Sequence, residues 1–318
     1  MAHRQVNRRG FMKKTVLASA GAAAAMSLEE QILLAAEKTP ARPAKAAAKG
    51  MPTGKIGKLT ISRIICGGNL ISGFAHSRDL VYVSALLRHY FTDEKVFATL
   101  EACEANGINT AILRLDDRTI GLLEKYRKRG GKIQWIAQIK TRDSKLTRDA
   151  QKAIDHGAVG AYVQGGVGDR LVADGKTEIL GQFVEYARSK GVIGGIGGHT
   201  LAVPMACEKA GVEADFYMKT LHGTSYWSHS SMEGTHDNVW AATPDKTIAF
   251  MNTVAKPWIA FKVLAAGAIN PTVGFKYAFR GGADFACVGM FDFQVAQDAR
   301  ILKGLFARGV KRPRPWRA

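Results

Sequence analysis

The sequence predicts an α/β protein of the (β/α)8 TIM-barrel class, with one large domain that takes up most of the 318 residues. Eight short apolar runs, each ending in glycine or a polar residue, alternate with amphipathic stretches of helical length. The length suits a single barrel, and no internal repeat suggests a solenoid. Eight parallel strands joined by helices are the number that closes such a barrel.

The expected strands are rich in aliphatic and small residues, as buried parallel strands are. They cover residues 61–69, 108–114, 133–140, 158–166, 192–200, 214–223, 257–267 and 283–291. The expected helices lie between them, at residues 93–106, 117–129, 147–156, 178–190, 203–210, 244–254, 271–280 and 295–307. Several of these helices end at a glycine, which adopts the left-handed conformation of a helix C-cap at little cost.

The first 36 residues have the composition of a targeting segment. Arg8 and Arg9 are followed by Phe11, two lysines and an alanine-rich stretch, and this order resembles a twin-arginine signal peptide. The apolar stretch is too short and too weakly hydrophobic for a permanent membrane span. The sequence leaves open whether the signal is removed or retained as an anchor. The resemblance implies that the protein is already folded when it passes through the twin-arginine translocation machinery. Its destination would be the periplasm or another exported location.

Two further boundaries follow from composition. Residues 37–50 form a Pro/Ala/Lys linker, which cannot bury enough apolar surface to fold by itself. The barrel is expected at residues 51–306, and residues 307–318 form a basic C-terminal tail.

The net charge of +18 arises from 45 lysines and arginines against 27 aspartates and glutamates. Residues 1–50 alone hold nine of these cations against three glutamates, and the remaining excess is spread over helices that also carry acids. The sequence has no known nucleic-acid-binding motif and no basic stripe interleaved with aromatic residues. We therefore expect a small-molecule substrate and no nucleic-acid partner.

Cys66, Cys103, Cys207 and Cys287 lie far apart and form no CxxC pair. Neither a zinc ribbon nor a redox dithiol is indicated. The sequence predicts that these cysteines are buried as small hydrophobic residues.

Three stretches resemble the aldo/keto reductase superfamily. The opening hairpin and first strand of that family are similar to MPTGKIGKLTISRIICGGNL. Its fifth strand, with the helix before it, is similar to VEYARSKGVIGGIGGHT. Its eighth strand and the helix after it are similar to ADFACVGMFDFQVAQDARIL. The resemblance covers about residues 51–306. It implies a nicotinamide cofactor, NAD or NADP, held mainly by the later strands and the last helix, at Gly289, Gln297 and Asp298. Because residues 290–294 lack a basic side chain, a preference for the 2′-phosphate of NADP is not indicated.

The catalytic set of that family is Asp, Tyr, Lys and His, and it is incomplete here. The second strand reads GINTAILRLDD, so the family's tyrosine falls near Arg114 or Asp117. Lys140 matches the lysine of the third strand, and Gln164 stands at the histidine position. Loss of the acid that meets the developing alkoxide ordinarily costs several orders of magnitude in rate, so the acid/base set would have to be rebuilt.

Polar residues at strand ends are the best candidates for chemistry, because the active site of such a barrel lies at the carboxyl ends of its strands. The candidates are Asn69, Lys140, Gln164, His199, Lys219, His222 and Lys262. Burial and mutual repulsion of the lysines would lower a lysine pKa and supply a neutral amine. Equally, a lysine can point outward between helices and each histidine can be structural. Lys262 has the strongest claim, because it interrupts an otherwise apolar strand.

A polar loop follows the sixth strand and contains His229, Glu233 and His236 beside Tyr226, Trp227 and Trp240. Its length suits a lid or a sugar-stacking surface. The spacing could hold a metal only on a helix, and the serine and glycine between the three residues disfavour one, so no metal site is predicted.

Three functions are compatible with these residues. The first is an exported aldo/keto reductase-like oxidoreductase acting on a small polar carbonyl compound or sugar, with an acid/base set around Lys140 and His222. The second is a lyase, aldolase or isomerase that uses Lys262 or another lysine without nicotinamide. The third is a non-catalytic binding protein. The fold alone does not choose among them.

Overall fold

The computed structural model describes residues 50–77, 80–141, 143–226 and 241–318, which belong to one compact unit, Ala47–Ala318. The twin-arginine segment and most of the linker lie outside the described residues. In the part of the chain that is described, no helix is both long and apolar enough to cross a bilayer.

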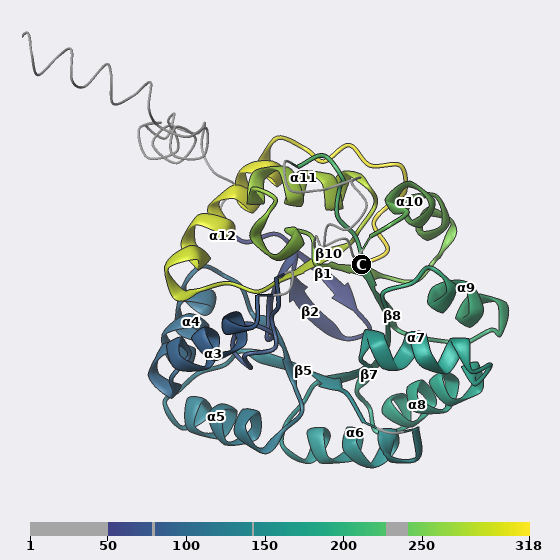
Figure 1. The fold of residues 1–318 in the computed structure, drawn as a ribbon, viewed down its shortest axis with the longest axis horizontal. Helices are drawn as coiled ribbons and strands as arrows, with labels where there is room; N and C mark the ends of the chain where they lie inside the picture. The colour runs from purple at the N-terminus through teal and green to yellow at the C-terminus, as the bar shows by residue number, and fades with distance from the viewer. Residues whose placement is uncertain (1–49, 78–79, 142, 227–240) are drawn as a thin grey trace, which may run out of the picture. The chain divides into compact units, whose positions relative to one another are not determined.

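Eight parallel strands close into a barrel, as the sequence predicts (Figure 1). The closure is made by β10, which pairs with both β3 and β9. The strands in chain order are β3 (Ile64–Gly67), β4 (Thr110–Arg114), β5 (Gln134–Ile139), β6 (Gly160–Val163), β7 (Ile193–Gly198), β8 (Phe216–Thr220), β9 (Trp258–Phe261) and β10 (Phe285–Val288). Each lies within an apolar run that predicted a strand.

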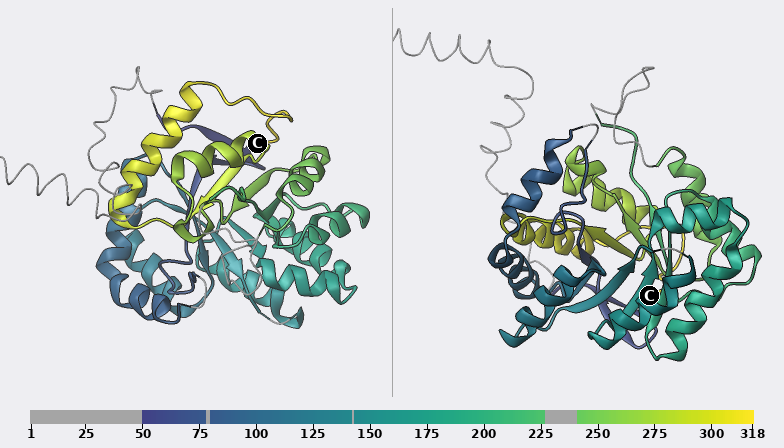
Figure 2. Two further views of the ribbon diagram at one scale, coloured as in Figure 1. Left: turned by 45° about the horizontal axis from the view of Figure 1, so that its top comes forward. Right: turned by 60° about the horizontal axis from the view of Figure 1, so that its bottom comes forward.

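The helices form an outer ring around the strands (Figure 2). All eight predicted helices are confirmed, with ends that differ by a few residues. They are α4 (Asp93–Ala105), α5 (Asp117–Lys128), α6 (Leu146–Asp155), α8 (Thr177–Ser189), α9 (Ala202–Lys209), α10 (Pro244–Thr253), α11 (Pro271–Arg280) and α12 (Asp292–Ala307). Short polar residues cap several of them, as when Asp116 accepts a hydrogen bond from Thr119 N at 2.8 Å.

Among the described residues, two α-helices were not predicted, α3 (Tyr82–Tyr90) and α7 (Gly165–Ala173). The prediction of a strand over residues 158–166 was wrong at its end, because β6 stops at Val163 and α7 begins two residues later. Glycines are poor helix formers, but the Gln164 side chain accepts hydrogen bonds from Gly166 N at 3.0 Å and Val167 N at 3.3 Å. This N-cap satisfies backbone donors that the start of the helix would leave unpaired.

Side chains alternate between the barrel interior and the layer beneath the helices. Ile112, Ile136, Tyr162 and Ile193 belong to the interior cluster, whereas their strand neighbours pack against helices. The hairpin of β1 (Thr53–Ile56) and β2 (Leu59–Ser62) adds Ile56 and Ile61 to the interior cluster. A Cβ on Gly57 would lie 3.3 Å from Ile193, the first residue of β7, so the hairpin closes the amino end of the barrel.

The basic tail is packed against the barrel through a buried ion cluster. Asp284, which is fully buried, accepts hydrogen bonds from Arg312 at 2.9 Å and Arg314 at 3.2 Å. Arg63 donates to the carbonyl oxygen of the last residue, Ala318, at 2.7 Å. Much of the tail's charge is therefore used within the fold.

All four cysteines are free and buried, which confirms their interpretation as core residues.

Candidate functional site

The carboxyl ends of the strands bring several predicted residues to one side of the sheet. Arg114, Lys140, Gln164 and His199 follow the alternation of the interior residues on their own strands. In a barrel of this kind these positions surround the site where a ligand meets the protein.

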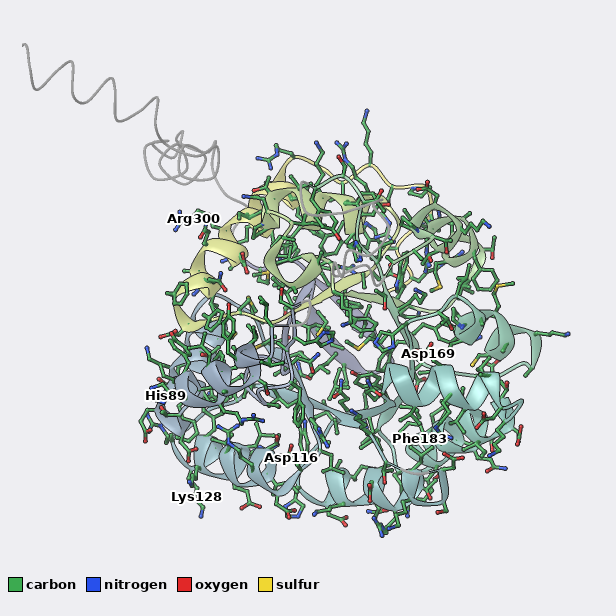
Figure 3. All side chains as sticks on the ribbon, viewed as in Figure 1. His89, Asp116, Lys128, Asp169, Phe183 and Arg300 are labelled. Atoms are coloured by element: carbon green, nitrogen blue, oxygen red, sulfur yellow. The ribbon has the colours of Figure 1, made fainter. Side chains whose placement is uncertain are left out.

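His199 directly follows β7 and is held by Asp169, a residue of α7 that is labelled in Figure 3. His199 Nδ1 lies 2.7 Å from Asp169 Oδ2, and the same carboxylate accepts hydrogen bonds from the backbone N–H groups of His199 and Thr200. Burial alone would raise the pKa of Asp169, but the hydrogen bonds from His199 and Thr200 lower it overall. An ionised Asp169 holds the Nδ1 proton of His199, which leaves Nε2 to act on a ligand.

Two neighbours fix the plane of the His199 ring. A Cβ on Gly165, the first residue of α7, would lie 2.9 Å from His199 Cε1, so only glycine lets the imidazole rest against this backbone. On another side the ring centroids of His199 and Phe261 are 5.4 Å apart. The imidazole is thus held by the first residue and the Asp169 carboxylate of α7 and by the aromatic ring of Phe261 in β9.

Lys219 is on the outer side of β8, with Tyr217, and not in the barrel interior. It is 2% exposed, and its ammonium donates to the carbonyl oxygens of His199 at 2.7 Å and Thr220 at 2.9 Å. Burial lowers its pKa to about 8. Lys219 therefore supports the backbone of His199 from behind.

Lys262 follows β9 and has a positive φ of 60°. A residue in this conformation breaks the alternation of its strand, and such strain is concentrated at functional sites. After two intervening residues, Ala265 (φ 44°), Ala266 (φ 56°) and Gly267 (φ 94°) are again left-handed and form the turn η2 (Ala265–Gly267). Burial lowers the pKa of Lys262 to about 8.

His76, from the segment between β3 and α3, belongs to the same region. Burial lowers its pKa first, and the positive charges of Lys262 and His199 lower it further. The side chains of His76, His199 and Lys262 are therefore near enough for their charges to interact.

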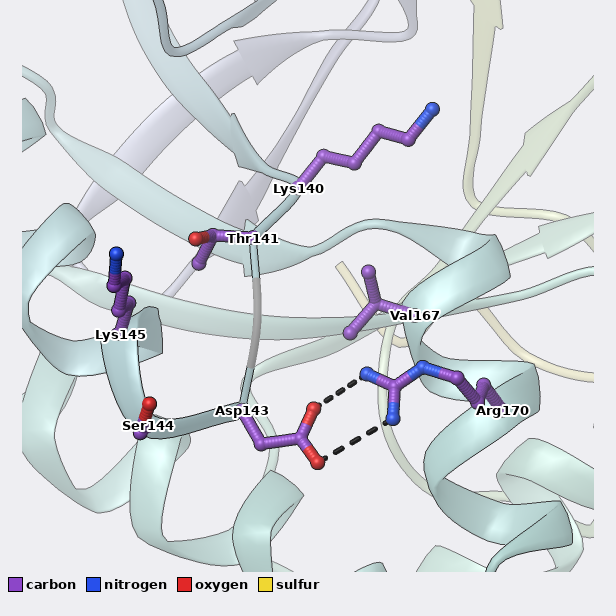
Figure 4. Close-up of a pocket in the computed structure, with 7 residues that line it drawn as sticks. All are labelled: Lys140, Thr141, Asp143, Ser144, Lys145, Val167 and Arg170. Carbon is purple, nitrogen blue, oxygen red and sulfur yellow. Dashed lines mark hydrogen bonds and ion pairs between the residues drawn. The ribbon is translucent and has the colours of Figure 1, made fainter.

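Lys140 is exposed and lines a cleft of about 760 Å³ beside the end of β5. The other lining residues are Thr141, Asp143, Ser144, Lys145, Val167 and Arg170. Asp143 pairs with Arg170, and the Lys140 side chain extends away from this ion pair (Figure 4). Gln164, next along the barrel, uses its side-chain oxygen to cap α7, and Asn69 is exposed after β3.

His222 is fully buried, and both of its ring nitrogens have partners. Nδ1 lies 2.9 Å from the carbonyl oxygen of Gly223, and Nε2 accepts a hydrogen bond from Ala241 N at 3.1 Å. These bonds require the neutral ring with its proton on Nδ1, which is the arrangement of a structural histidine. The catalytic role predicted for His222 is untested, and the geometry favours His199 for it.

The predicted cofactor residues lie on β10 and α12. Gly289 follows β10, Gln297 is exposed, and Asp298 is 4% exposed with its pKa raised to about 6 by burial. In the first turn of α12, Asp292 is already bonded to Tyr90 and, at 2.8 Å, to Lys95.

The loop residues His229, Glu233 and His236 lie outside the described residues. Within the described ranges, no group of three or more His, Cys, Asp or Glu side chains could hold a metal ion.

The sequence reasoning missed Asp169 and His76. The start of α7 was read as strand, so an aspartate one turn into that helix had no predicted neighbour. The sequence could have indicated Asp169 by its position, five residues after the predicted site residue Gln164. His76 follows Asn69 in a segment to which no element was assigned.

No model of a protein family matches the chain, and no curated protein matches it. Solved structures do. A Pseudomonas aeruginosa protein assigned to the aldo-keto reductases superimposes with a TM-score of 0.56 at 16% identity, over 80% of this chain and 94% of that one. A second structure with the same assignment and organism gives 0.56 at 14% identity, over 81% and 99%. A point mutant of Gox0644, solved in complex with NADPH, gives 0.52 at 9% identity, over 83% and 90%.

The chain has the (β/α)8 barrel fold of these aldo-keto reductase structures. The chain has the eight parallel strands and the amino-terminal hairpin that the three resembling stretches imply, so the expected fold is confirmed. In this barrel, His199 stands at the end of the fifth strand and Lys262 at the end of the seventh.

Proposed function

We propose that this chain is an oxidoreductase that reduces the carbonyl group of a small polar compound with a nicotinamide dinucleotide, and that His199 is its general acid. The observation that carries the proposal is the pairing of His199 with Asp169 at the carboxyl end of the barrel, at 2.7 Å. A histidine positioned in this way can give a proton to a developing alkoxide and take one back in the reverse reaction.

The histidine replaces a missing tyrosine. Residues 114–117, at and after the end of β4, are Arg, Leu, Asp and Asp, so no phenol is present where the resemblance places one. Reduction adds hydride to the carbonyl carbon and requires a proton at the oxygen. His199 Nε2 would supply that proton, while Asp169 stabilises the positive charge of the protonated ring.

The residues present fit a nicotinamide dinucleotide at the ends of β9 and β10. The left-handed turn of residues 264–268 lies after β9, where its backbone would approach the diphosphate. The N–H groups of Ala265, Gly267 and Ala268 donate to carbonyl oxygens of the turn and would not bind it. When bound, the dinucleotide supplies the hydride. Gox0644 has been solved with NADPH in the same fold, which supports a cofactor of this class.

The last helix favours NAD over NADP. The first eight residues of α12, Asp292 to Ala299, contain two aspartates and no lysine or arginine. The first cation, Arg300, is exposed and points away from the barrel in Figure 3. A 2′-phosphate near this helix would find no cation among residues 292–299.

Two experiments test the proposal. The first is a titration of the purified full chain with NADH and with NADPH, monitored by nucleotide fluorescence. The second is a turnover assay on small aldehydes, ketones and sugars. We expect binding of NADH and slow reduction of at least one polar carbonyl compound. His199→Gln should retain nucleotide affinity and lose turnover by about 10²-fold or more. Absence of affinity for either nucleotide would remove the proposal.

A lysine-dependent carbon–carbon lyase or isomerase is the second candidate. It is favoured by Lys262, because a pKa of about 8 leaves a larger neutral fraction of amine at pH 7 than an ordinary lysine has. The amine would add to a substrate carbonyl and lose water to give an iminium. Borohydride with a carbonyl substrate would then leave a covalent mass adduct on Lys262, and Lys262→Met would abolish both adduct and turnover.

We also propose that the protein is exported to the periplasm through the twin-arginine route, on the basis of Arg8 and Arg9. Replacing both with lysine retains the charge but removes the pair that this route reads. The double variant should accumulate folded in the cytoplasm, as measured by cell fractionation, with Lys13 and Lys14 changed to arginine as the charge-matched control. Unaltered export of the double variant would disprove this route.

A further inference from the structure

We infer that Arg114 and Phe74 form a binding site for the carboxylate group of a small ligand at the carboxyl end of the barrel. The site is independent of the reaction proposed above, because neither residue takes part in that reaction. It is indicated by a largely buried guanidinium that lies over an aromatic ring and whose N–H groups are not used within the described part of the chain.

The guanidinium of Arg114 donates no hydrogen bond to a described residue. Its side chain is 27% exposed, and its ion-pair contact, from Nε to Oδ2 of Asp116, is 3.9 Å long. That distance is too great for a hydrogen bond. The other described arginines that are not exposed all donate to carbonyl oxygens, and they are Arg63, Arg127, Arg312 and Arg314. Arg114 differs from them in having its donors available for a ligand.

Phe74 supports the guanidinium from one side. Cζ of Arg114 lies over the Phe74 ring, 4.4 Å from its centroid, in a contact that uses none of the N–H groups. The backbone N–H of Phe74 donates to the carbonyl oxygen of Asn69 at 2.9 Å, and Arg118 of α5 donates to that of Ile71 at 3.0 Å. The segment that carries the ring is thus tied to its own start and to a neighbouring helix.

The position of Arg114 on its strand places it at the end of the barrel where ligands enter. It is the last residue of β4 and lies on the same side of that strand as Ile112, which belongs to the interior cluster. Across the sheet it pairs with Gln138, whose neutral side-chain amide donates to Tyr162 Oη at 2.7 Å. The neighbour of Arg114 on β5 therefore brings no negative charge to the site.

A largely buried guanidinium with unpaired donors costs free energy, and an oxyanion bonded to it would offset that cost. The planar fork of arginine matches a carboxylate, which it can bind through two parallel hydrogen bonds. Asp116, which caps α5 by accepting from Thr119 N at 2.8 Å, favours a singly charged carboxylate, because it would repel the second charge of a phosphate. The Phe74 ring is 48% exposed and offers apolar surface to the carbon skeleton of the ligand.

Isothermal titration of the full chain with benzoate and with its neutral amide, benzamide, at constant ionic strength tests this site. We expect benzoate to bind and benzamide to bind about tenfold more weakly or worse, because charge-assisted hydrogen bonds are the stronger ones. Arg114→Gln should weaken benzoate binding by about tenfold or more. Arg114→Lys keeps the charge but loses the fork and should restore only part of the affinity. Arg280→Gln, at an exposed arginine of α11, is the matched control and should leave the affinity unchanged.

A measurement on the wild type keeps the test valid even if a variant does not fold. Benzoate should protect Arg114 from modification by phenylglyoxal, as measured by peptide mass spectrometry, and benzamide should not. Absence of this protection, equal binding of benzoate and benzamide, or unchanged benzoate affinity in folded Arg114→Gln would each overturn the inference.

Two further titrations identify the source of the anion. Inorganic phosphate should displace benzoate only at higher concentration than benzoate itself, and tighter binding of phosphate would overturn the carboxylate class. Arg114→Gln should retain its affinity for NADH, and loss of that affinity would assign the guanidinium to the nucleotide instead. Benzoate binding without nicotinamide affinity would leave this site and remove the reductase, whereas reduction without benzoate binding would remove this site alone.

Discussion

The side chains of His199 and Asp169, which are thirty residues apart in sequence, are in direct contact, with Nδ1 of His199 2.7 Å from Oδ2 of Asp169. The carboxylate also accepts from Thr200 Oγ1 at 3.0 Å, so it is fixed by contacts other than the imidazole. Asp169 therefore holds the ring in one tautomer and one orientation, and this relationship has direct consequences for activity.

Asp169→Asn should lower the kcat of carbonyl reduction by about 10²-fold and change KM by less than about threefold. The amide keeps the volume of the side chain but cannot stabilise the protonated imidazole. Steady-state kinetics measure the effect, and Asp174→Asn, at the other end of α7, is the control. A kcat equal to that of the wild type would exclude the pair from the mechanism.

Gly165→Ala should reduce activity while preserving stability. The added methyl would lie 2.9 Å from His199 Cε1 and would push the ring away from its position. Alanine is otherwise favourable within a helix, by roughly 1 kcal/mol over glycine. Gly121→Ala on α5, where nothing lies within 4 Å of the new methyl, should stabilise without loss of activity. Equal activity of the two variants would contradict the placement of the ring.

The stability of the wild type should rise between pH 8 and pH 10 relative to that of Lys219→Met. Burial lowers the pKa of Lys219 to about 8, so above that pH the unfolded chain binds more protons than the folded one. The difference in free energy of unfolding between the two proteins should change by up to about 1.4 kcal/mol per pH unit. Urea denaturation at a series of pH values measures it, with Lys276→Met as the control. Parallel curves for wild type and Lys219→Met would show that Lys219 keeps an ordinary pKa.

Asp284→Asn should destabilise the fold by about 3–5 kcal/mol, because Arg312 and Arg314 would be left as buried cations without a carboxylate. Their side chains are 5% and 1% exposed. The midpoint of urea unfolding measures the loss, and Asp155→Asn on the surface of α6 should have little effect. A change below about 1 kcal/mol would mean that the C-terminal tail adds little to stability.

The sequence alone was sufficient for the fold class, the order of the strands and the eight helices of the repeating unit. These features depend on local patterns: apolar runs with polar ends, amphipathic stretches, and glycines that end helices. The burial of Cys66 and Cys287 followed from the same patterns, because both stand in apolar strand runs. Helix α7 was not predicted, because its first turn is rich in glycine, which is a poor helix former. The side chain of Gln164 stabilises this turn.

The tertiary structure decided which polar residues meet. A strand-end position predicts that a side chain lies at the carboxyl end of the barrel, and His199 and Lys262 follow β7 and β9 there. It does not predict the direction of a side chain. Lys219 lies on the outer side of its strand, and both ring nitrogens of His222 are hydrogen-bonded to nearby backbone groups. Asp169 and His76 became part of the site only through closure of the barrel. Partners of this kind lie far apart along the chain, and no local pattern in the sequence records the distance between them in the folded protein.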